Sequence, residues 1–145
     1  MNNKLMIGLT ALLLLIGANA TTVVAAELAV IVHPSNSMSR ISENELSDIY
    51  LGATDTFPNG GAAEPVDQAA QSPARSHFIK AVLGMNESAL QSYWSKLMFS
   101  GKGEPPKQLP GDMEVRRFVA TNPNAIGYID KSDVDSSVKV VLIIP

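Results

Sequence analysis

Apolar and polar positions follow two periods along the chain, one typical of strands and one typical of helices. The run at 28–33 (LAVIVH) is almost continuously β-branched and apolar, which predicts a strand buried on both faces. Residues 125–129 (AIGYI) and 138–144 (VKVVLII) predict two further strands, and 64–67 (EPVD) predicts a short one.

Four segments repeat apolar residues at helical spacing and predict helices at 41–52, 72–84, 86–101 and 112–123. The intervening residues 102–112 (KGEPPKQLPGD) predict a connection rich in proline and glycine. The order is therefore strand, helix, strand, three helices and two strands. This order predicts one α/β domain with a mixed sheet flanked by helices.

Helix ends and buried faces are marked in the sequence. Ser42 and Glu45 have the spacing of a capping box, and Asp112 is the expected cap of the last helix. The apolar stripes predict which helical residues face the core: Leu46, Ile49, Tyr50, Phe78, Ile79, Val82, Leu83, Leu90, Trp94, Leu97, Met98, Val115, Phe118 and Val119.

The first 26 residues have the pattern of a secretory signal. A short positive region ending at Lys4 precedes an apolar run at 5–18, which is shorter than the roughly 20 residues that span a membrane. Small residues allow cleavage after Ala20 or Ala26, and the second choice starts the mature chain directly before a strand. We expect residues 27–145 to form one periplasmic domain without stable membrane insertion; the alternative is an uncleaved anchor.

Composition excludes several classes of function. The chain has a net charge of −3, and removal of residues 1–26 with their single charge, Lys4, makes the remainder more acidic. This balance argues against nucleic acid as a partner. There is no cysteine, hence neither a disulfide framework nor a thiolate metal site. We expect no cofactor and no metal.

Enzymatic chemistry finds little support. The two histidines are His33, at a strand end, and His77, within a predicted helix. Ser76 and His77 are neighbours on that helix, so their side chains diverge by about 100° and do not form a nucleophile–base pair. The sequence therefore predicts a protein that is not an enzyme.

The start of the second predicted helix is the strongest candidate site. Ser72 stands as N-cap and Pro73 at the first helical position, so Ala74 and Arg75 follow at positions two and three. Backbone N–H groups there lack intrahelical partners, and an arginine one turn away suits phosphate or carboxylate. Two interpretations remain open: a cap beside a surface arginine, or an anion site.

Three segments together resemble the second lobe of bacterial phosphate-binding proteins, the periplasmic components of phosphate ABC transporters. They are residues 28–52 (LAVIVHPSNSMSRISENELSDIYLG), 65–78 (PVDQAAQSPARSHF) and 123–129 (PNAIGYI). The resemblance implies a single lobe of the type II periplasmic-binding-protein fold. It also implies a periplasmic solute-binding protein that binds phosphate or a similar oxyanion in ABC-type uptake.

The same resemblance assigns a site with departures. Ser72 matches the family's serine, whereas Pro73 replaces a glycine and Gln68 stands about where an arginine is common. We predict anion contacts from Ser72, Arg75, Gln68 and Ala74, with Arg75 substituting for the lost charge. The family's first lobe has no counterpart here. The implied partners are a second chain that completes the clamshell or an ABC permease. The alternative is an interaction module that has lost its ligand and docks a periplasmic or membrane partner.

Overall fold

The structure is a computed structural model that describes Ala18, Ala20 and residues 26–145. The predicted signal segment lies outside the described residues, apart from Ala18, Ala20 and Ala26. Among the residues that are described, no helix combines the length and the apolar character needed to cross a membrane.

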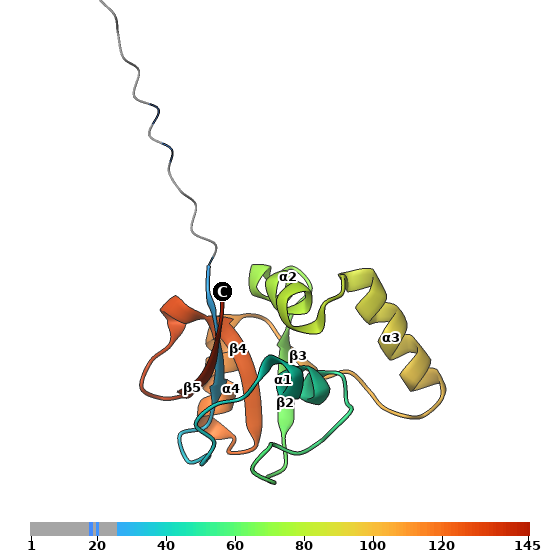
Figure 1. Ribbon diagram of the computed structural model, residues 1–145, viewed down its shortest axis with the longest axis horizontal. Coiled ribbons are helices and arrows are strands. Elements are labelled where there is room, and N and C mark those ends of the chain that lie inside the picture. Colours follow the sequence, from blue (N-terminus) through green and yellow to red (C-terminus); the bar gives the residue numbers. More distant parts are fainter. Residues whose placement is uncertain (1–17, 19, 21–25) are drawn as a thin grey trace, which may run out of the picture.

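The strands form one five-stranded sheet in the order β3-β2-β4-β1-β5 (Figure 1). β2 runs parallel to β3 and β4, whereas β1 runs antiparallel to β4 and β5. The predicted mixed sheet is therefore confirmed. The strands are β1 (Leu28–Val32), β2 (Glu64–Gln68), β3 (Lys107–Leu109), β4 (Ala125–Asp130) and β5 (Lys139–Ile144).

This arrangement places the ends of several strands along one edge of the sheet. Leu28 at the start of β1 pairs with Asp130 at the end of β4 and with Ile144 at the end of β5. Gln68 at the end of β2 pairs with Leu109 at the end of β3. The carboxyl ends of four strands thus share this edge, which we call the carboxyl edge. In open α/β sheets, ligands bind beyond such an edge.

The helices follow the predicted order, with differences at their ends. They are α1 (Glu43–Tyr50), α2 (Pro73–Phe78), the π-helical η1 (Ile79–Leu83), α3 (Glu87–Phe99), α4 (Asp112–Thr121) and the 3₁₀ turn η2 (Lys131–Asp133). The capping box of Ser42 and Glu45 is confirmed. The prediction that Asp112 caps α4 is wrong: Gly111 is the cap residue, and the Asp112 carboxylate accepts a hydrogen bond from Gln68 instead.

Alternate residues of β1 supply two cores, one on each face of the sheet. Leu28, Val30 and Val32 pack with α1 and α2, and Ala29 and Ile31 pack with α4. All five are essentially inaccessible to solvent, as the unbroken apolar run predicted. Helices therefore cover both faces, and α2 begins above the carboxyl edge (Figure 1).

α3 stands apart from the two main cores (Figure 1). Leu90 and Trp94 are buried in a small third cluster with Ile79, whereas Met98 is 50% exposed although its stripe predicted burial. The connection predicted at 102–112 also contains β3, because Lys107–Leu109 pairs with the end of β2. Three residues beside prolines carry too little apolar pattern to predict such a strand.

Candidate functional site at the carboxyl edge

Ser72 begins α2 as expected, but its side chain does not cap the helix. Its backbone is extended, at φ −68° and ψ 126°, and Pro73 occupies the first helical position. The hydroxyl makes no capping bond to α2 and donates instead to Gln68 Oε1 at 2.5 Å. Because Ser72 does not cap, the N–H of Ala74 lacks the side-chain acceptor that a capped helix start provides.

Gln68, buried at the end of β2, orients Ser72. Its amide Nε2 donates to Asp112 Oδ1 at 2.7 Å and to the carbonyl oxygen of Tyr128 at 2.8 Å. These two bonds use both amide hydrogens and fix Oε1 toward Ser72. The structure thus brings Gln68 and Ser72 together, as their grouping in the predicted site requires.

Arg75 is buried and paired with two carboxylates. Its Nε lies 3.2 Å from Asp67 Oδ2, and its NH1 group donates to Glu87 at the start of α3. The sequence predicts Arg75 either as a surface residue or as part of an anion site. The surface alternative is wrong, because Asp67 at the end of β2 draws the guanidinium inward.

Asp67, which the sequence interpretation missed, is the centre of a buried polar network. Besides its ion pair with Arg75, the Asp67 carboxylate accepts hydrogen bonds from the hydroxyl of Tyr128 and from the backbone N–H of Gln68, the latter at 2.8 Å. Burial, and secondly the Asp67 charge, raise the pKa of Tyr128 far above its usual range. A carboxylate at the end of a buried strand, eight residues before an arginine, was the available signal.

Carboxylates also lie on the other side of Gln68. Asp112 interacts with Asp133, and a hydrogen bond between the two carboxyl groups raises the pKa of Asp133. Arg116 binds this region through the carbonyl oxygen of Asp133 and a 3.3 Å ion pair with Asp135. The side chains around Ser72 therefore present more acceptors than donors. Within the described residues no cluster of three or more His, Asp or Glu could hold a metal ion.

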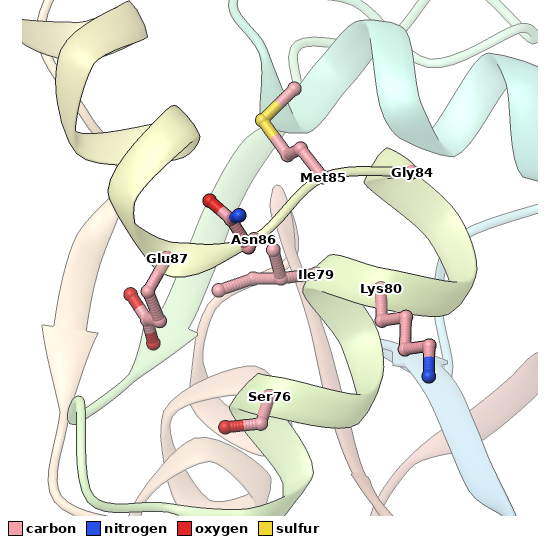
Figure 2. A pocket seen from close by; sticks show the side chains of 7 residues that line it. All are labelled: Ser76, Ile79, Lys80, Gly84, Met85, Asn86 and Glu87. Atoms are coloured by element: carbon pink, nitrogen blue, oxygen red, sulfur yellow. The ribbon is translucent and has the colours of Figure 1, made fainter.

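Two hollows flank the helix pair α2–α3, and neither contains Ser72. The first, of about 690 Å³, lies where η1 turns into α3, with Lys80 and Glu87 on opposite sides of Ile79 (Figure 2). The second, of about 410 Å³, is bordered by Arg75, Trp94 and Gln108. The first is lined by Ser76, Ile79, Lys80, Gly84, Met85, Asn86 and Glu87. It contains none of the four predicted anion contacts.

No protein-family model matches the sequence, and no curated protein sequence matches it. Solved structures do match, and they define the class: the fold is that of phosphate ABC transporter substrate-binding proteins. The resemblance inferred from the three sequence segments is therefore confirmed. Two of these neighbours are described as a substrate-binding protein and as a transport receptor.

One such structure is a phosphate ABC transporter substrate-binding protein from Clostridium perfringens with bound phosphate. It is 25% identical to this chain, with a TM-score of 0.64, and the match covers 80% of this chain and 45% of that one. An ABC-type phosphate transport receptor from Vibrio cholerae matches at 20% identity and a TM-score of 0.63, over 80% and 46% of the two chains. PstS from Borrelia burgdorferi matches at 15% identity and a TM-score of 0.60, over 80% and 47%. This chain spans less than half the length of each.

Proposed function

We propose that this chain is a secreted, periplasmic solute-binding protein that binds phosphate or a similar oxyanion, in association with ABC-type phosphate uptake. The observation that carries the proposal is the shared fold with the Clostridium perfringens protein, which holds phosphate. The apolar run at 5–18 before the domain supports export.

We place the anion at the carboxyl edge, above the start of α2. There the Ala74 N–H has no capping side chain, and the Ser72 hydroxyl would have to leave Gln68 Oε1, to which it donates, in order to donate to the anion. The charge of Arg75 is balanced by the carboxylates of Asp67 and Glu87. For its guanidinium to contact the anion directly, it would have to leave the half-exposed carboxylate of Glu87.

This set of donors binds weakly on its own. Even if Ser72, Ala74 and Arg75 all donate to the anion, three charge-assisted hydrogen bonds contribute roughly 5–9 kcal/mol in total, and association costs at least about 4 kcal/mol. The remainder corresponds to a dissociation constant near the millimolar range. Micromolar capture therefore requires further donors from a second chain or from an ABC permease that closes over the edge.

Calorimetric titration with sodium phosphate at low ionic strength tests the site. We expect binding heat for residues 27–145, little or none for Ser72→Ala, and an unchanged titration for Ser76→Ala. Ser76 lies on the same helix but borders the hollow beside α3, so it controls for the loss of a hydroxyl from α2. The proposal is wrong if the wild type gives no heat at millimolar phosphate. It is also wrong if the wild type and Ser72→Ala give equal heats.

A second candidate is an interaction module that retains the lobe without a ligand. The pairing of Arg75 with both Asp67 and Glu87 favours it, since that charge is already neutralised. Pro73, which has no N–H to offer an anion, also favours it. Under this alternative the titration gives no heat, and affinity capture from a periplasmic extract recovers a partner equally well with the wild type and Ser72→Ala.

A further inference from the structure

Arg75 offers an unused hydrogen-bond donor to the smaller of the two hollows beside α3. Its side chain is only 9% exposed, with Nε paired with Asp67 and the NH1 group with Glu87. The NH2 group has no hydrogen-bond partner among the described residues. None of their buried side-chain nitrogens lacks a partner, so NH2 is open to solvent. Arg75 borders the hollow of about 410 Å³, and we infer that NH2 opens into it.

The rest of this hollow combines an apolar wall with uncharged polar side chains. The wall is formed by Leu90, Trp94, Met98 and Pro105. The side chains that can donate or accept hydrogen bonds are those of Gln91, Ser95 and Gln108. Glu87 is the only carboxylate among the bordering residues, and Asp67 holds Arg75 by its Nε. The volume lies within the range of small-molecule sites.

We propose that this hollow binds a small organic acid, with the ligand's carboxylate on the NH1 and NH2 groups of Arg75 and its apolar body against Trp94 and Met98. The inference goes beyond the proposed function, because Ser72 does not border the hollow. The end of a guanidinium group matches the two oxygens of a carboxylate. Glu87 uses NH1 alone, so the chain's own carboxylate marks the position and leaves half of the fork free.

A ligand carboxylate would take the place of Glu87. The Glu87 side chain is 47% exposed, and ion pairs with such exposed partners contribute little. Glu87 also borders the larger hollow, so its carboxylate has room to turn away from Arg75. The ligand gains a second hydrogen bond and buries apolar surface, neither of which Glu87 does. Glu87 is therefore an internal competitor that limits the affinity of the site.

Fluorescence of Trp94, the single tryptophan of the chain, reports on this hollow. The probe is sodium phenylacetate, titrated at constant ionic strength. Phenylacetamide, which lacks the charge, and acetate, which lacks the apolar body, are the control ligands. We expect a saturable change with phenylacetate alone, at a dissociation constant in about the millimolar range, because neither control makes both kinds of contact.

Glu87→Gln and Glu43→Gln form a matched pair of variants. Each glutamate is the first residue of a helix, so both substitutions remove the same charge from the same helical position. Glu43 begins α1 and does not border the hollow. We expect Glu87→Gln to bind phenylacetate about fivefold more tightly than the wild type, because Arg75 loses its competitor. Glu43→Gln should bind like the wild type.

Three results would overturn the inference: no saturable change in the wild type or in Glu87→Gln, equal binding of phenylacetamide, or equal affinities of the two variants. The phosphate titrations of Ser72→Ala and the wild type keep the proposed function separate. If phenylacetate binds as expected and phosphate gives no heat, the hollow stands and the proposed function fails. If phosphate heat depends on Ser72 and phenylacetate does not bind, the proposed function stands and this inference is wrong.

Discussion

Nε of Arg75 lies 3.2 Å from Oδ2 of Asp67, and the two side chains are only 9% and 11% exposed. This pair connects the end of β2 to the first turns of α2, the two elements between which Ser72 lies. The second partner of Arg75, Glu87, begins α3 and is 47% exposed. Arg75 therefore joins β2, α2 and α3, and the more buried of its two ion pairs is the one with Asp67.

Arg75→Ala is expected to lower the free energy of unfolding by about 3 kcal/mol, because it leaves the Asp67 carboxylate buried without its cation. Glu87→Gln, which keeps the size of the side chain, should cost less than about 1 kcal/mol since that partner is half-exposed. Urea denaturation of residues 27–145 measures both. Equal costs would contradict the assignment of Asp67 as the principal partner. A loss of phosphate binding in Arg75→Ala is uninformative without this measurement.

Tyr128→Phe should destabilise the fold by roughly 1–3 kcal/mol, since it removes a donor from buried Asp67. The ring itself stacks on Phe78, with centroids 4.0 Å apart, and phenylalanine preserves that contact. Tyr93→Phe is the control, because its hydroxyl donates to the Leu51 carbonyl at a partly buried position. Urea midpoints that fall equally for the two variants would argue against a special role for Asp67.

The main elements could be predicted because each carries a local signal. The unbroken apolar run of β1 predicted burial on both faces, and the spacing of Ser42 and Glu45 predicted a capping box. β3 could not be predicted, since three residues form a strand there only by pairing with β2. The exposure of Met98 likewise depends on where α3 ends relative to the cores.

The candidate site was predictable in its residues and not in its hydrogen bonds. Ser72 and Pro73 occupy the helix positions that their order predicts. The partner of Arg75 is eight residues away on another element, and Asp112 reaches Gln68 from 44 residues away. Periodicity carries no information about such long-range pairs. Whether the cluster binds an anion stays a prediction.

Gly127→Ala should lower the free energy of unfolding by about 1–3 kcal/mol through overpacking. A Cβ at this position of β4 would stand 2.5 Å from Cγ1 of Val115 on α4 and 3.1 Å from Cγ2 of Val66. Gly103→Ala, whose new Cβ would meet only Trp94 at 3.8 Å, should be nearly neutral. The double variant Gly127→Ala/Val115→Ala should cost less than the sum of its parts, because removing the valine methyls relieves the clash. If the stability losses derived from the urea midpoints are additive, the cost of Gly127→Ala does not come from its contact with Val115.

Asp133→Asn is expected to stabilise the protein slightly at pH 7, by up to about 0.5 kcal/mol, because its carboxylate faces that of Asp112 near the surface. The pKa of Asp133 is raised in the folded state, so the folded protein holds this proton more tightly than the unfolded chain. The wild type therefore gains stability relative to the variant as pH falls through the raised pKa toward the ordinary aspartate value near 4.

Thermal unfolding of both proteins between about pH 7 and pH 4 measures how far the two stabilities converge. The control is Asp135→Asn: hydrogen bonds from the hydroxyl and the backbone N–H of Ser137, and less strongly the charge of Arg116, lower the pKa of Asp135, so its effect should have the opposite sign. A stability difference for Asp133→Asn that does not change with pH would contradict the carboxyl–carboxylate contact.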